Sequence, residues 1–103
     1  MIIHAEFPIQ AQERERFLSY TERWVKASLK EAGVISYRAY EAIDHPNTFS
    51  FVEVYTDQAA LDAHHKTAHV KEMLSVFPDF LAGQPDVQTF DAQNRPDPLE
   101  GNS

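Results

Sequence analysis

One continuous stretch decides the fold of this chain: Phe49-Ser50-Phe51-Val52-Glu53-Val54-Tyr55-Thr56-Asp57-Gln58-Ala59-Ala60-Leu61-Asp62-Ala63-His64-His65-Lys66-Thr67-Ala68-His69. Its first third alternates, with three aromatic residues and Glu53 on one face, which predicts a strand with that face buried. Asp57 is a suitable N-cap, so a helix should begin at Gln58. We expect that helix to kink or break near Thr67-Ala68. The sequence therefore predicts a strand followed at once by a helix that packs back over it.

Glu53 and His64 are the candidate catalytic pair within this stretch. A carboxylate among aromatic side chains is costly unless another group pairs with it. We predict that Glu53 orients His64 and raises its basicity, so that the imidazole can take a proton from a phenol or enol. The alternative is a buried polar pair that only holds the helix on the sheet.

The flanking residues extend this unit to a complete domain. Alternation and helical periodicity predict the remaining elements, which are a strand at Ile2–Ile9, a helix at Ala11–Ala32, a strand at Val34–Ala42 and a last strand at Asp86–Asp91. Gly33 should end the first helix by adopting a positive φ. Pro78 should end the second helix or start a last turn. The order is that of an α+β, ferredoxin-like βαββαβ fold, with a four-stranded antiparallel sheet and two helices on one face.

Such a sheet has a second face that the helices leave bare. Ile2, Val52 and Val54 are candidates for this face. The simplest cover is the same face of a second copy, so we predict a twofold homodimer that joins through the sheet. Residues 1–91 are expected to form the domain. Residues 92–103 are polar and proline-rich and are expected to form a tail, or an arm laid on a partner.

Composition excludes several classes of protein. The 103 residues suffice for one domain, and the net charge of −7 without clustered Lys or Arg argues against nucleic-acid binding. No apolar run approaches the length that spans a bilayer, and the N-terminus does not resemble a signal peptide. Cysteine is absent, which removes disulfides, thiolate nucleophiles and cysteine zinc sites. A cytoplasmic location fits these features.

Further residues could contribute to a binding site. Five aromatic residues could line a cavity for a flat ring, although membership of the core is the simpler interpretation for most; they are Trp24, Tyr37, Phe51, Tyr55 and Phe77. His65, His69 and Glu72 have the spacing of one helix face, but three ligands on one straight helix diverge. We therefore predict no metal and no cofactor, with His69 at the mouth of the pocket.

Three segments resemble the antibiotic biosynthesis monooxygenase (ABM) domains. They are Glu31-Ala32-Gly33-Val34-Ile35-Ser36-Tyr37, Asp44-His45-Pro46-Asn47-Thr48-Phe49, and Glu53 through His64 followed by His69. The resemblance covers all of the chain except the tail. It implies a dimeric α+β barrel with a pocket between the sheet and the helices of each subunit.

The resemblance leaves the reaction open, because family members include cofactor-independent quinol and polyketide monooxygenases, an isomerase of a phosphorylated signalling molecule, and haem degraders. Phe7, Tyr55 and Leu74 stand where haem-degrading relatives carry Asn, Trp and a ligating His, so haem degradation is set aside. The main hypothesis is a monooxygenase for a quinol or polycyclic phenol, a small aromatic molecule. The alternatives are an isomerase of a small carbonyl or phosphorylated compound and a non-catalytic ligand-binding dimer.

Overall fold

A computed structural model describes residues 1–93 of the chain. Its elements follow the order expected of a ferredoxin-like domain, with the second helix divided in two. They are β1 (Ile2–Pro8), the 3-10 helix η1 (Ala11–Glu13), α1 (Arg14–Leu29), β2 (Val34–Glu41), β3 (Thr48–Tyr55), α2 (Gln58–His65), α3 (Ala68–Phe80) and β4 (Asp86–Phe90). The α+β prediction is confirmed in the form βαββααβ. The predicted tail at 92–103 lies almost wholly outside the described residues, so it stays a prediction.

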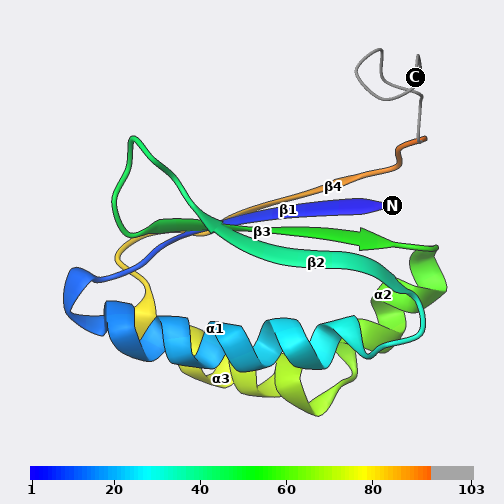
Figure 1. The fold of residues 1–103 in the computed structure, drawn as a ribbon, viewed down its shortest axis with the longest axis horizontal. Helices are drawn as coiled ribbons and strands as arrows, with labels where there is room; N and C mark the ends of the chain where they lie inside the picture. The colour runs from blue at the N-terminus through cyan, green and yellow to red at the C-terminus, as the bar shows by residue number, and fades with distance from the viewer. Residues whose placement is uncertain (94–103) are drawn as a thin grey trace, which may run out of the picture.

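The strands form one antiparallel sheet in the order β2-β3-β1-β4. Figure 1 shows α1, α2 and α3 together on one side of this sheet, while the other side carries no helix. Strand β3 is central and pairs with both β1 and β2. The residues at the end of β3 and the start of α2 therefore lie where the helical layer meets the middle of the sheet.

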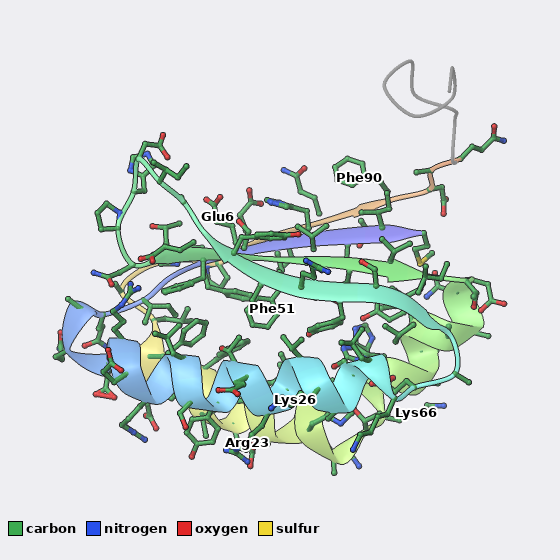
Figure 2. The ribbon with its side chains drawn as sticks, in the orientation of Figure 1. Glu6, Arg23, Lys26, Phe51, Lys66 and Phe90 are labelled. Atoms are coloured by element: carbon green, nitrogen blue, oxygen red, sulfur yellow. The ribbon has the colours of Figure 1, made fainter. Side chains whose placement is uncertain are left out.

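Alternation in the sequence decides which face of the sheet is buried. Phe49, Phe51, Glu53 and Tyr55 are all buried, whereas the residues between them are only partly buried. Figure 2 shows Phe51 between the sheet and the helices, and Glu6 and Phe90 on the bare side. The core therefore lies between one sheet face and the helical layer.

The division between α2 and α3 has a local cause in two caps. Asp57 accepts a hydrogen bond from the backbone N–H of Ala60 at 2.9 Å and begins α2. Thr67 begins α3: its hydroxyl oxygen accepts from the N–H of Val70 at 3.3 Å and donates to the carbonyl of His64 at 2.7 Å. Each cap satisfies N–H groups that a helix start leaves unpaired. This confirms the expected break, and it brings the last turn of α2 beside the first turn of α3.

The end of the first helix differs from expectation, whereas the end of the second does not. Helix α1 ends at Leu29, and no glycine of the described residues has a positive φ. Gly33 is needed for space instead, because a Cβ there would lie 2.2 Å from the Cβ of Ala60. Pro78 lies in the last turn of α3, two residues before its end at Phe80, which is one of the two outcomes predicted for it. The early end of α1 leaves Glu31 in the turn that leads into β2.

Candidate functional site

A largely apolar cavity of about 570 Å³ lies between the buried face of the sheet and helix α3. It is lined by Ile3, Ala5, Phe7, Tyr37, Glu53, His64, His65, Val70, Met73, Leu74, Phe77, Pro78, Leu81, Pro85 and Val87. Tyr37 faces Glu53 across the β2–β3 pair, and its ring centroid is 5.4 Å from that of His64. Three polar side chains are thus gathered in one part of an apolar space, as in many small-molecule sites.

His64 lies in the last turn of α2 with only 3% of its surface exposed. Its Nδ1 is 2.9 Å from Oε2 of Glu31, which is a hydrogen bond. A carboxylate can only accept, so Nδ1 carries the proton of the neutral ring and Nε2 carries the lone pair. Burial is the main influence on the ring and lowers the pKa of His64, which the nearby Glu31 partly offsets. The imidazole is therefore neutral near pH 7.

Glu31 also binds a second imidazole. Nε2 of His69, in the first turn of α3, lies 2.7 Å from the same Oε2. The two imidazole rings are 5.7 Å apart between centroids. One carboxylate oxygen thus joins the turn after α1 to the ends of α2 and α3. The His69 prediction is refined: the side chain is one-fifth exposed and bonded to Glu31, and it is not among the residues that line the cavity.

Glu53 does not form the expected hydrogen bond to His64. Its Oε1 accepts from the hydroxyl of Tyr55 at 2.5 Å, while His64 uses Glu31. The prediction that Glu53 pairs directly with His64 was wrong. Sequence spacing placed both residues at the cavity, but it could not show which carboxylate reaches Nδ1 of His64. Burial, together with the negative charge of Glu31, raises the pKa of Glu53 to about 7. Glu53 is therefore partly protonated at neutral pH.

The hydroxyl of Tyr37 is buried and makes no hydrogen bond among the described residues. It lies near Ser28 and Glu53, and burial is the main reason why the pKa of Tyr37 is raised. A buried hydroxyl without a partner is uncommon in folded proteins. Tyr37 is among the residues that line the cavity, although its hydroxyl oxygen itself is buried.

The other predicted binding residues divide into two groups. Phe77 lines the cavity, with its ring 4.7 Å from that of Phe7. Trp24, Phe51 and Tyr55 are each 1% exposed and are not among the lining residues, so they act as core. This agrees with the simpler interpretation offered for most of the aromatic residues. Glu31 is the site residue that the sequence reasoning missed, although it begins the first segment that resembled the ABM domains.

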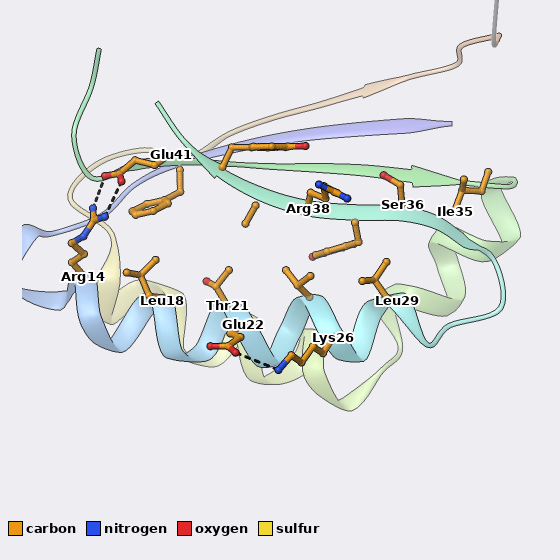
Figure 3. Close-up of a pocket in the computed structure, with 15 residues that line it drawn as sticks. Arg14, Leu18, Thr21, Glu22, Lys26, Leu29, Ile35, Ser36, Arg38 and Glu41 are labelled. Carbon is orange, nitrogen blue, oxygen red and sulfur yellow. Dashed lines mark hydrogen bonds and ion pairs between the residues drawn. The ribbon is translucent and has the colours of Figure 1, made fainter. Parts of the chain in front are cut away.

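A second groove lies between α1 and β2 (Figure 3), with a volume of about 780 Å³. It contains Tyr37, but no other residue predicted for the site. Four of its five charged side chains already pair, Arg14 with Glu41 and Lys26 with Glu22 at 3.2 Å, and Arg38 is the fifth. The groove therefore lacks the neighbouring imidazole and carboxyl groups that the cavity beneath α3 contains.

Glu31, His64 and His69 also form the one group of three potential metal ligands found within residues 1–93. The set considered and rejected on helical spacing, His65, His69 and Glu72, is not brought together, because α2 ends at His65 and Glu72 accepts a hydrogen bond from the indole of Trp24 at 2.8 Å. None of the helices in the described part of the chain is long and apolar enough to cross a membrane.

The fold and the site define a small α+β domain with an apolar cavity and a cluster of carboxylate, imidazole and phenol groups. Residues 1–75 match the family model described as "Antibiotic biosynthesis monooxygenase". The chain belongs to this family, which confirms the resemblance seen in the sequence.

Similar proteins agree with this assignment. The chain is 30% identical over 87 residues to "Putative monooxygenase YcnE" of Bacillus subtilis, covering 84% of this chain and 92% of that protein. It is 29% identical over 90 residues to "Uncharacterized protein sll1783" of Synechocystis, covering 87% of this chain but 61% of that protein's length. A crystal structure of an antibiotic biosynthesis monooxygenase superimposes with a TM-score of 0.83 at 23% identity, covering 91% of this chain and 100% of the other. The last comparison shows the shared fold.

Proposed function

We propose that the chain is a cofactor-independent monooxygenase that acts on a quinol or polycyclic phenol, with His64 as the base. One observation carries the proposal. The Nδ1–H of His64 is held by Glu31, which leaves the lone pair on Nε2 in a buried ring that lines the cavity. Glu31 therefore takes the positioning role that the sequence had suggested for Glu53. A neutral, oriented imidazole is a suitable base for a phenolic proton.

The reaction balances without a bound redox group if the quinol supplies the electrons. His64 removes a phenolic proton, and the resulting anion passes an electron to O₂. A C–O bond then forms at a ring carbon that carries hydrogen, and the proton returns to the peroxide as water leaves. One oxygen atom stays in the ring as a hydroxyquinone, and the other becomes water. The four electrons come from oxidation of the two hydroxyls and of the ring C–H bond.

The remaining polar groups would position the substrate. The hydroxyl of Tyr37, which has no hydrogen-bond partner among the described residues, would donate to the phenolate oxygen once its side chain turns toward the bound ring, and this would stabilise the charge that develops there. Glu53 in its protonated form can donate to a second oxygen on the ring. The rest of the lining is apolar and includes Phe7 and Phe77, which suits a flat aromatic body.

The test is oxygen uptake with a panel of naphthohydroquinones, corrected for their spontaneous oxidation. The wild-type protein should consume O₂, and His64→Ala should lower the rate by about 10²-fold or more. Glu31→Gln should also lower it, because an amide cannot stabilise the protonated ring as a carboxylate does. His45→Ala is the control, since His45 is exposed in the β2–β3 turn. Equal rates for wild type and His64→Ala across the panel refute the proposal.

An isomerase of a phosphorylated compound is less well supported. Binding of a phosphate normally requires Arg or Lys, and neither is among the residues that line the cavity. Lys26 lines the groove between α1 and β2 instead and pairs with Glu22. Anaerobic exchange of solvent protons into a substrate would favour an isomerase. Ligand-induced thermal stabilisation without turnover would favour the non-catalytic dimer.

We also propose that the bare sheet face joins two copies in a homodimer. Ile2, Val52 and Val54 are only partly buried on this face, and Tyr40 and Phe90 are 51% and 48% exposed. Apolar side chains on an uncovered sheet face indicate an interaction surface. Light scattering should give twice the chain mass, and Val52→Lys should give the monomer mass. A monomeric wild-type protein at micromolar concentration refutes this assembly.

A further inference from the structure

The junction of the three helices places unlike ligand atoms in one small volume. Oε2 of Glu31 lies 2.9 Å from Nδ1 of His64 and 2.7 Å from Nε2 of His69, and the three potential ligand atoms all lie within 4.8 Å of one another. The residues come from the turn after α1, the last turn of α2 and the first turn of α3. They therefore converge from different directions, unlike three ligands on one straight helix.

The composition of this cluster matches a known class of metal site. Two histidines and one carboxylate, with a further position left to water, form the ligand set of several catalytic zinc sites. Bonds of about 2.0–2.2 Å in a tetrahedron place ligand atoms roughly 3.3 Å apart. The two hydrogen bonds of Glu31 are shorter than this by less than 1 Å. To bind one ion, the carboxylate oxygen would move away from each imidazole by less than 1 Å, and the two ring nitrogens, which lie within 4.8 Å of each other, would approach to about the same spacing.

The surroundings hold the ligands and still allow access. The Thr67 hydroxyl bonds to the carbonyl of His64 at 2.7 Å and caps α3, which fixes the turn between the two histidines. Side-chain exposures of 17% for Glu31 and 18% for His69 leave that side of the cluster open to solvent. The side chain of His64 is only 4% exposed and forms the inner side of the cluster. A rigid set of ligands with one open side is what a bound ion and its water require.

We propose that Glu31, His64 and His69 bind one divalent transition-metal ion of the zinc class, through Oε2, Nδ1 and Nε2 respectively. Binding replaces the two hydrogen bonds to Glu31. It also fixes the proton of His64 on Nε2, because a neutral ring ligated through Nδ1 has no other place for it. The ion would thereby remove the base from the cavity, so it inhibits turnover. This second consequence rests on the proposed function, whereas the metal site does not.

Zinc binding to the full chain, freed of metal by a chelator, is the direct test. Competition with a chromophoric chelator should show one zinc per chain, and Co²⁺ should give the visible bands of a tetrahedral site. Each of Glu31→Gln, His64→Gln and His69→Gln should weaken binding by more than about tenfold, since loss of even an outer partner has effects of this size. His65→Gln is the matched control, because His65 adjoins His64 in sequence but is not in the cluster.

The outcomes separate the metal site from the proposed reaction. Unchanged binding in folded His69→Gln, or no binding by wild type at 100-fold excess zinc, overturns the site. If Glu31→Gln or His64→Gln fails to fold by circular dichroism, His69→Gln and the cobalt spectrum still decide, because His69 is partly exposed. Zinc binding at the site without any oxygen uptake in the metal-free protein would refute the oxygenase and leave the site standing. Oxygen uptake that zinc does not reduce would refute the inhibition alone.

Discussion

Replacing Glu53 with Gln should change the way in which stability depends on pH. Glu53 is 7% exposed, and burial is the main reason why its pKa is raised from the ordinary value of 4.5 to about 7. The folded protein therefore holds a proton between these pH values that the unfolded chain has released. The amide of the Glu53→Gln variant would keep an oxygen to accept from Tyr55 but would have no proton to lose.

The sign follows from proton linkage. The free energy of unfolding falls with rising pH wherever the folded state binds more protons than the unfolded state, here from about pH 4.5 to about pH 7. A difference of about 2.5 between the two pKa values corresponds to roughly 3 kcal/mol. The wild type should lose this amount between pH 4 and pH 8, and Glu53→Gln should not. Any fixed cost of the amide shifts the variant equally at every pH.

Urea unfolding of both proteins at one concentration, at each pH from 4 to 8, measures this difference. Comparing the two proteins cancels the titration of every other group, and equal concentrations cancel any effect of assembly. Glu22→Gln is a control on the surface, where loss of the pair with Lys26 should change stability by less than about 1 kcal/mol. A difference between wild type and Glu53→Gln that stays constant within about 0.5 kcal/mol would show that Glu53 is ionised in the fold and that the argument from burial fails.

Three further substitutions test other parts of the structure. Tyr37→Phe should leave the urea midpoint equal or higher, because the hydroxyl it removes is buried and unpartnered. Oxygen uptake with naphthohydroquinones should fall. A loss of more than about 1 kcal/mol in the free energy of unfolding would reveal a hydrogen bond at this hydroxyl. Gly33→Ala should destabilise the chain by about 1–3 kcal/mol in urea unfolding, since the new Cβ would lie 2.2 Å from the Cβ of Ala60. Adding Ala60→Gly should recover part of this loss. No recovery would contradict the argument that the two residues approach too closely for a Cβ at position 33. Asp57→Ala should lower stability by about 1 kcal/mol through loss of the α2 cap, as measured by thermal unfolding, and an unchanged midpoint would count against it.

Much of the fold was predictable because its signals are local. The alternation in β3 decided the buried face, and the capping residues Asp57 and Thr67 lie within the helical turns that they begin. The order of strands and helices then left few topologies. For Pro78 the sequence left two outcomes open, and the structure has the last turn, because loss of one hydrogen bond near the end of α3 is tolerated when the packing of Phe80 holds that turn.

The site was harder to predict because its contacts are distant in the sequence. Glu31 bonds to residues 33 and 38 positions away. Its role depends on α1 ending at Leu29, three residues before the predicted end at Ala32, which turns Glu31 out of the helix toward the α2–α3 junction. Sequence patterning could identify a buried acid and a nearby imidazole. It could not choose between two carboxylates, since that choice depends on how three helix ends pack.

The two carboxylates differ because their partners differ. Glu31 accepts from two imidazoles and is partly open to solvent, so hydrogen bonds and water stabilise its carboxylate. Glu53 has only the hydroxyl of Tyr55 and lies in an apolar wall, and the charge of Glu31 raises its pKa further. The same charge opposes the effect of burial on His64. Glu31 thus acts on both groups at once: it holds the proton of His64 on the side away from the cavity and favours a proton on Glu53 within it. A neutral imidazole and a carboxyl group with a raised pKa beside one cavity therefore both depend on a single carboxylate that is not among the residues lining it.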